Sequence, residues 1–239
     1  MKRKFIFPVI SVCLGALIAL VMLEIFLRFF PVGESLFFQS VNEENPVFRA
    51  EPDRSGWYSK NWNFKHAARW RSNNDGFIND RDYKTPIERE TESTGLIAVI
   101  GDSYVEALIV PPRESFFERL EKEMEGRQLV YSFGFSGAPL SQYLIWARYA
   151  QETYKNDYLI VLVIGNDFDE SLLEYKSAEG GHYYEKSEGG LKLKRVDFTP
   201  SIMGRVARRF FIFQYTAHNI QLLLPPPPPP IFPRKTIRG

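Results

Sequence analysis

The feature that most constrains this fold is a short apolar run, rich in β-branched residues, that ends abruptly in turn-forming residues. The run is Leu96–Ile100, and Gly-Asp-Ser follows it directly at positions 101–103. A run of this length that stops at turn chemistry predicts a buried strand of a parallel sheet. Two later apolar runs, Leu129–Phe133 and Tyr158–Ile164, also end in loops rich in glycine and polar residues. We therefore expect three neighbouring strands whose ends carry the polar residues of a site.

Helical patterns separate the three runs. Residues Glu114–Glu125 are expected to form one helix, and Leu140–Tyr154 carries apolar and aromatic residues at helical spacing. Fully apolar strands that alternate with amphipathic helices indicate a parallel sheet covered on both faces, and right-handed crossovers make it doubly wound. The predicted class is α/β. The third run is too apolar for a half-exposed strand, so we expect it to be buried as well.

A long apolar segment begins directly after the basic residues at the N-terminus. It extends from Phe5 to about Phe30, and roughly 20 apolar residues suffice to cross a bilayer core. We interpret residues 1–30 as an uncleaved signal anchor, a single transmembrane helix, because the run is long for a signal peptide and lacks an Ala-x-Ala site. A cleaved signal peptide and a lipidated Cys13 are the alternatives. The basic flank predicts a cytoplasmic N-terminus, with the rest of the chain outside.

Charged and metal-binding residue types exclude several classes of function. The formal net charge is +1 and no basic stripe is present, so nucleic acid is not an expected partner. The three histidines, His66, His182 and His218, are far apart in the sequence and lack metal-ligand spacing, so no metal or cofactor is predicted. Within the apolar segment, Glu24 lies one turn before Arg28, and we expect the two side chains to pair near the far interface.

Other regions flank or interrupt the expected α/β domain, which covers residues 95–224. Residues 31–94 are polar, aromatic and irregular, and we interpret them as a connector that packs its aromatic residues on the domain; a carbohydrate surface is the alternative. Residues 168–200 contain two Gly-Gly pairs and alternating Leu and Lys, which predicts an exposed hairpin or cap. A helix is expected over Ser201–Leu224. Residues 225–239 begin with six prolines, which predict an extended polyproline tail.

Three candidate catalytic residues follow the three expected strands. In open α/β sheets, ligands bind outside the carboxyl ends of the strands. Ser103 exposes a hydroxyl at a strand-to-helix turn, Gly137 offers a backbone N–H without an obstructing Cβ, and Asn166 adds a side-chain amide. Gly134 competes with Gly137 for its role, and Asp102 is expected to cap the helix. A serine nucleophile beside donors that face a developing oxyanion is the arrangement that acyl transfer or ester hydrolysis requires.

This order of motifs resembles the SGNH (GDSL-type) hydrolase superfamily over about residues 95–170. The resemblance implies that Ser103 is the nucleophile and that Gly137 and Asn166 complete the oxyanion hole. It also implies a flavodoxin-like three-layer α/β/α fold of about five parallel strands, of which about three are expected here. Residues 95–224 would then be a partial domain of this type, with residues 168–200 as an insertion.

The N-terminal anchor adds to the resemblance. It is similar to that of bacterial membrane-anchored members of the superfamily. The implied location is the bacterial cytoplasmic (inner) membrane, crossed once, with the catalytic domain on the extracytoplasmic side. The implied substrates are acyl esters, including acetylated glycans.

The sequence departs from the family at its Asp-x-x-His motif, which supplies the catalytic base and the residue that orients it. Tyr215, not aspartate, stands three residues before His218, and the helix expected there is rich in Phe and Leu. His182 lies in the glycine-rich insertion, and His66 precedes the sheet. A serine without a base is a weak nucleophile, so we expect impaired activity. One hypothesis is a truncated form of a longer hydrolase, in which the proline tract marks a shifted reading frame.

Three functions remain open at this stage. The first is a serine esterase that acts on acyl esters outside the cytoplasmic membrane. The second is an O-acyltransferase that modifies cell-surface polysaccharide through the same acyl-enzyme. The third is a non-catalytic, membrane-anchored binding or assembly protein, which the absent base favours.

Overall fold

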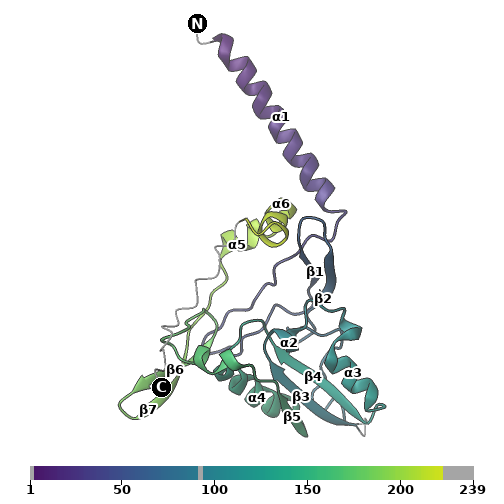
Figure 1. The fold of residues 1–239 in the computed structure, drawn as a ribbon, viewed down its shortest axis with the longest axis vertical. Helices are drawn as coiled ribbons and strands as arrows, with labels where there is room; N and C mark the ends of the chain where they lie inside the picture. The colour runs from purple at the N-terminus through teal and green to yellow at the C-terminus, as the bar shows by residue number, and fades with distance from the viewer. Residues whose placement is uncertain (1–2, 91–93, 223–239) are drawn as a thin grey trace, which may run out of the picture.

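The strand expected from Leu96–Ile100 is the centre of a parallel sheet in the computed structural model, which describes residues 3–90 and 94–222 (Figure 1). The sheet has the order β4-β3-β5 and consists of β3 (Gly95–Gly101), β4 (Gln128–Gly134) and β5 (Tyr158–Val161). Both neighbours of β3 run parallel to it. The mixed α/β class and the three parallel strands are therefore confirmed.

Helices pack on both faces of this sheet, because successive side chains of a strand point to opposite sides. One face of β3 packs with α4 (Leu140–Tyr154), where Trp146 is buried, and the other with α3 (Phe116–Glu123), where Phe117 is buried. The bounds of α4 are those predicted. Short helical turns follow the strands: α2 (Ser103–Glu106), η1 (Pro112–Glu114), η2 (Gly165–Asp167) and η3 (Asp169–Ser171).

The prediction that the third strand is buried and extends to Ile164 is wrong. β5 ends at Val161, and all four of its residues are exposed, from 36% for Ile160 to 59% for Tyr158. β5 lies at one edge of the sheet. β4 lies at the other edge but is buried, because Tyr83 and Phe77 pack on it. β5 pairs with β3 on one side, and no strand within residues 3–90 and 94–222 pairs with the other.

The region over residues 31–94 contains a regular element that was not expected. β1 (Ser55–Lys60) and β2 (His66–Arg71) form an antiparallel hairpin. Some aromatic residues of this region, Trp70 and Phe77 among them, pack on the domain, whereas Trp62 is 73% exposed. Trp70 is 4% exposed and Phe77 is fully buried, with the Phe77 ring centroid 4.8 Å from that of Phe133 on β4. This packing attaches the region to the face of the sheet that also carries α4.

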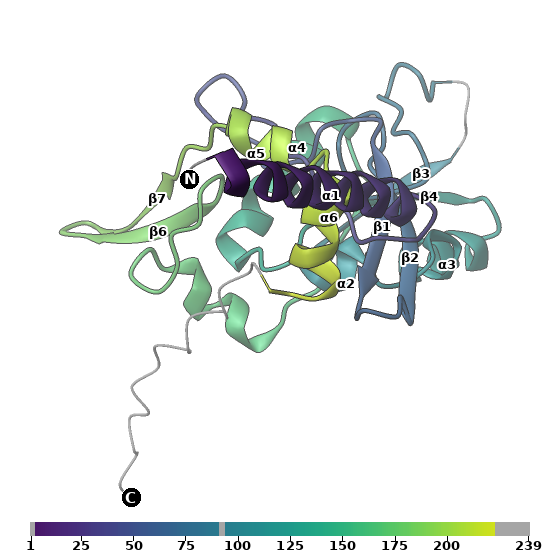
Figure 2. The same cartoon turned by 90° about the horizontal axis from the view of Figure 1, so that it is seen from above.

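The N-terminal helix α1 (Arg3–Leu27) extends away from the rest of the molecule (Figure 1), and in the view from above it lies across the other elements (Figure 2). Its stretch Phe7–Leu27 is long and apolar enough to cross a membrane, and it is not buried against other parts of the protein. The predicted ion pair is present near the end of the helix, where Arg28 Nη2 lies 3.0 Å from Glu24 Oε1.

Two predictions on the C-terminal half have different outcomes. The exposed hairpin expected within residues 168–200 is formed by β6 (His182–Ser187) and β7 (Gly190–Arg195). The single helix expected over Ser201–Leu224 is wrong, because the segment divides into α5 (Ile202–Ala207), α6 (Phe211–Gln214) and the π-helix η4 (Tyr215–Asn219).

The interruption between α5 and α6 is accompanied by side-chain bonds to the backbone on both sides of Phe210. Phe210 adopts an extended conformation, with φ −94° and ψ 122°. The Gln214 amide donates to the Arg208 carbonyl at 2.8 Å, and the Glu24 carboxylate accepts the N–H groups of Phe211 and Ile212. Side chains therefore satisfy backbone groups that a continuous helix would pair internally. The proline-rich tail of residues 225–239 lies outside the described residues.

Candidate functional site

Ser103 is the first residue of α2 and directly follows the turn after the central strand. Asp102 caps this helix as expected, because its Oδ1 accepts the N–H of Tyr104 at 3.1 Å. The Ser103 side chain is exposed, and its hydroxyl lies 3.4 Å from Asp102 Oδ2, a long hydrogen bond. The hydroxyl is thus accessible at the carboxyl end of the sheet.

Two glycines allow α2 to lie close against the strand ends. A Cβ on Gly134 would lie 2.7 Å from the Gly101 carbonyl oxygen and 2.8 Å from the Val105 Cβ. A Cβ on Gly101 would also collide with Val105. Val105 is fully buried between these positions. Gly134, which competed with Gly137 in the sequence, therefore has a packing role in the structure.

A buried carboxylate connects α2 to the loop after β4. Glu106 is 3% exposed, and its Oε2 accepts the Ser136 N–H at 2.9 Å and a short hydrogen bond from the Ser136 hydroxyl. Burial raises the Glu106 pKa to about 7, against the opposing effect of the Ser136 hydrogen bonds, and the Asp102 charge raises it further. The helix that carries Ser103 is thereby attached to the residue that precedes Gly137.

Gly137 lies at the turn between β4 and α4, with a φ of +75° that suits a residue without a Cβ. Its carbonyl oxygen accepts a hydrogen bond from Lys176 Nζ at 2.6 Å. The same ammonium forms a short ion pair with Glu170. Lys176 therefore connects the Gly137 loop to the segment that follows β5.

Asn166 lies in η2, exposed to solvent, and its amide donates to Glu170 Oε1 at 3.1 Å. Its neighbour Asp167 is buried and accepts the Tyr143 hydroxyl at 2.9 Å and the Ile164 N–H at 2.7 Å through Oδ2. These bonds fix the turn that carries Asn166 against α4.

Tyr143 lies near acidic groups from two of the three loops, those after β3 and after β5. Burial raises the pKa of its phenol, and so do the hydrogen bond to Asp167 and the charges of Asp167, Asp102 and Glu170. Asp102 follows β3, whereas Asp167 and Glu170 follow β5. Groups from two separate strand ends thus lie close enough to influence one buried phenol.

The three predicted residues are connected to different degrees. Gly137 and Asn166 are joined through Lys176 and Glu170. Ser103 is joined to Gly137 through the backbone of α2 and the Glu106–Ser136 hydrogen bonds. Among the described residues, the Ser103 side chain hydrogen-bonds only with Asp102. These bonds connect the three loops, and within the described residues the Ser103 side chain makes no hydrogen bond to Gly137 or Asn166.

The histidines are engaged elsewhere. His182 is buried, with its Nδ1 3.0 Å from Gln142 Oε1, and burial together with Arg195 lowers its pKa to about 4. His218 Nε2 lies 2.6 Å from the Ser35 hydroxyl. His66 is exposed at the first position of β2. In the described part of the chain, no group of three acidic, histidine or cysteine side chains could hold a metal ion.

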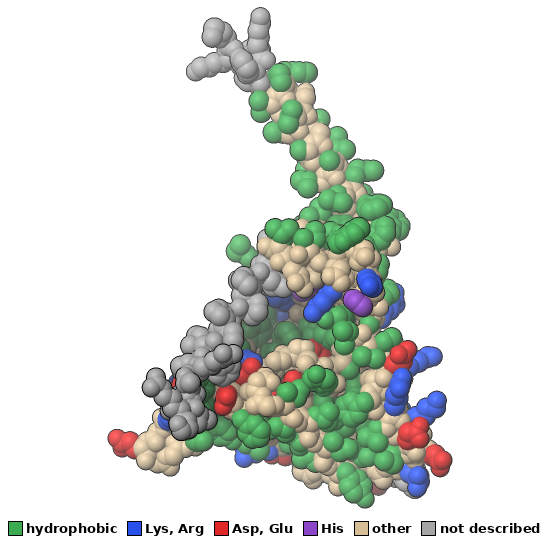
Figure 3. Space-filling view, viewed as in Figure 1, with side chains coloured by type: hydrophobic (Ala, Val, Ile, Leu, Met, Phe, Trp, Pro, Cys, Tyr) green, Lys and Arg blue, Asp and Glu red, His purple; other side chains and the backbone are tan. Residues whose placement is uncertain are grey.

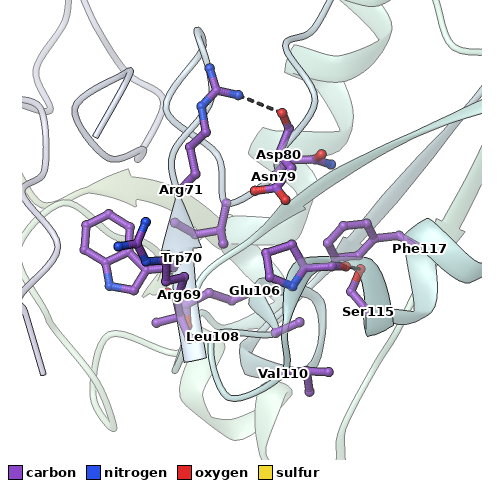
Figure 4. Close-up of a pocket in the computed structure, with 13 residues that line it drawn as sticks. Arg69, Trp70, Arg71, Asn79, Asp80, Glu106, Leu108, Val110, Ser115 and Phe117 are labelled. Carbon is purple, nitrogen blue, oxygen red and sulfur yellow. Dashed lines mark hydrogen bonds between the residues drawn. The ribbon is translucent and has the colours of Figure 1, made fainter. Parts of the chain in front are cut away.

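Two concave regions border this edge of the sheet. The first is a cavity that Glu106 lines, with a volume of only about 10 Å³. At its wall, the Arg71 guanidinium donates to the Asp80 carbonyl (Figure 4). The cavity has space for about one water molecule. An apolar groove of about 530 Å³ lies beside Asp167, and Tyr143, Phe168 and residues of β5 line it. The groove has the size typical of ligand pockets.

Sequence reasoning missed the side chains that connect the loops. Glu106 had a detectable signal, because it lies one helical turn after Ser103 and faces the same neighbourhood. Tyr143, Glu170 and Lys176 had none, because their roles depend on how α4 and the segment after β5 pack together.

Comparisons with protein-family models, with curated proteins and with solved structures found no match to this chain.

Proposed function

We propose that the edge where β3, β4 and β5 end is an acyl-ester site of the serine-hydrolase type. Ser103 is the nucleophile, and the Gly137 N–H and the Asn166 amide are the oxyanion donors. The supporting observation is a set of bonds between the loops: Glu106 with Ser136 beside Gly137, Lys176 with both Gly137 and Glu170, and Glu170 with Asn166. In this proposal the domain belongs to the SGNH superfamily and has its flavodoxin-like three-layer arrangement.

The apolar groove provides the place for the acyl part of the substrate. Tyr143 lines the groove and hydrogen-bonds Asp167, the residue after Asn166, so the groove begins at the polar site. The substrate class is an acyl ester, including acetylated glycans, outside the bacterial cytoplasmic membrane that α1 would cross.

Turnover is low in this proposal, because no histidine contacts Ser103 in the described residues. Binding and oxyanion stabilisation alone can retain about 10³–10⁴-fold catalysis over water in a hydrolase that lacks a triad member. The same observation favours a second candidate, a non-catalytic membrane-anchored binding or assembly protein. An O-acyltransferase would use the same acyl-enzyme with a sugar hydroxyl as acceptor.

The test is hydrolysis of p-nitrophenyl acetate by the full chain in detergent, beside the Ser103→Ala variant. We expect a slow release of p-nitrophenol that Ser103→Ala abolishes and Asn166→Ala lowers by about 10²-fold, the usual effect of one oxyanion donor. A rate that is unchanged in Ser103→Ala would exclude the esterase and leave the binding protein. A polysaccharide acceptor that takes up the acetyl group would identify the transferase.

A further inference from the structure

The segment over residues 202–219 has an amphipathic character opposite to that of a water-exposed helix. Its inward side chains are polar: Asn219 is 4% exposed, accepts the Gly33 N–H at 2.9 Å and donates to Ser59 Oγ at 2.9 Å. Gln214 is 2% exposed and accepts the Ser35 N–H at 3.2 Å. Polar residues usually occupy the outer face of a surface helix.

The outward side chains of the same segment are apolar. Met203 is 83% exposed, Ile202 80% and Phe210 54%. These residues line an open apolar depression together with Val206 and Phe213. We call these five residues the α5–α6 patch. Large contiguous apolar patches on a protein surface mark sites of contact with a partner or a membrane.

The patch is attached to the end of the apolar helix. The Glu24 carboxylate of α1 accepts the Phe211 N–H through Oε1 and the Ile212 N–H through Oε2, each at 3.0 Å. The Arg28 guanidinium pairs with the same carboxylate and lies 5.0 Å from the centroid of the Phe211 ring. α6 accordingly lies next to the foot of α1, with α5 beside α6 (Figure 1), and apolar side chains gather at this junction (Figure 3).

The position of Glu24 sets the depth of the patch relative to the apolar span. The span ends at Leu27, three residues after Glu24. At a rise of about 1.5 Å per residue, the start of α6 lies about 5 Å inside that end. Amphipathic helices that lie in a membrane surface are buried by about 5–10 Å. The two depths agree.

We infer that α5 and α6 form a second membrane contact, with the α5–α6 patch inserted into the outer part of the bilayer that α1 crosses. The occupant of the patch is phospholipid, because α6 is bonded to α1 at Glu24, which lies within the apolar span. The adjacent cations Arg28 and Arg205 already pair with Glu24 and Glu51. Arg209, beside Phe210, is exposed. Insertion is driven mainly by burial of apolar side chains.

The test uses the full chain in phosphatidylcholine nanodiscs, with Cys13→Ala to remove the native thiol. A nitroxide is attached in a Met203→Cys variant, and its collision rates with oxygen and with a water-soluble nickel chelate are measured by electron paramagnetic resonance. The matched control is Leu191→Cys, an apolar residue that is 59% exposed on the β6–β7 hairpin. We expect a severalfold lower nickel-to-oxygen ratio at position 203 than at 191.

Two results would overturn the inference. The first is an equal nickel-to-oxygen ratio at positions 203 and 191, which places the patch in water. The second is protection at 203 accompanied by dipolar broadening, where the broadening disappears when labelled protein is diluted with unlabelled protein, since this identifies a second copy of the chain as the occupant. A circular dichroism spectrum like that of the unlabelled protein shows that each variant is folded.

Discussion

The Glu106 carboxylate accepts two hydrogen bonds from Ser136, and this pair joins the helix that begins at Ser103 to the loop that contains Gly137. Burial and the nearby charge of Asp102 both disfavour the ionised form of the Glu106 carboxyl group. The attachment of Ser103 to Gly137 is consequently sensitive to pH.

Glu106 should make stability fall as the pH rises through neutrality. Its pKa rises from 4.5 to about 7 on folding, so the folded protein binds this proton more tightly than the unfolded chain. The stabilisation is present below pH 4.5 and is lost as the pH approaches and passes 7; the shift corresponds to about 3 kcal/mol. Thermal unfolding of wild type and Glu106→Gln at pH 5 and pH 8 measures the difference. Glu106→Gln should gain relative stability at pH 8, whereas Glu185→Gln, at an exposed ion pair, should not.

Lys176 should hold the Gly137 loop in place. Its ammonium bonds both the Gly137 carbonyl and Glu170, so Lys176→Met releases the loop from the segment after β5. We expect faster hydrogen exchange at the amides of residues 136–138 in Lys176→Met, measured by mass spectrometry. Lys186→Met is the control, because Lys186 pairs with Glu174 in an exposed position. Equal exchange in both variants would show that Lys176 does not restrain this loop.

The parts of the fold that could be predicted from the sequence are those that local patterns determine. The run at Leu96–Ile100 and the helix Leu140–Tyr154 carry complete periodic signals, and both are found at or near their predicted bounds. The exposure of β5 could not be predicted. An apolar strand has the same sequence at the centre and at the edge of a sheet, and only the pairing of whole strands distinguishes the two.

The broken helix after Ser201 and the contacts of the site share another cause. The break at Phe210 depends on Glu24, which lies 187 residues from Phe211 in the sequence. The bond between Lys176 and Gly137 spans 39 residues. Such contacts satisfy backbone groups only after distant segments have packed together, so a local pattern carries no signal for them.

Tyr83 should stabilise the outer edge of β4. Its hydroxyl accepts the Ser132 N–H at 2.8 Å and donates to the Ser132 carbonyl at 2.7 Å, where the neighbouring strand of a larger sheet would bond. Tyr83→Phe leaves two buried backbone groups without these bonds, which should destabilise the protein by about 2 kcal/mol or more. Tyr215→Phe removes an exposed bond to the Trp62 carbonyl and should cost less than about 1 kcal/mol. Thermal melting of the two variants tests the order, and equal losses would contradict it.

Gly76 and Gly126 separate two effects that a substitution to alanine can have. Both have positive φ values, +88° and +76°, so alanine strains the backbone at either position, by about 1–2 kcal/mol. At Gly126 no atom lies within 4 Å of the added Cβ, whereas at Gly76 the Cβ would collide with the Ala50 carbonyl group. Gly76 also accepts the Ala50 N–H at 2.9 Å, so neither segment can move without losing that bond. We expect Gly126→Ala to lower the melting temperature by a few degrees and Gly76→Ala to lower it much further, because backbone atoms on both sides of the collision are fixed by the buried Phe77 cluster. Similar melting temperatures would mean that the turn at Gly76 can shift away from Ala50, and that it contributes less to the attachment of residues 31–94 than its packing indicates.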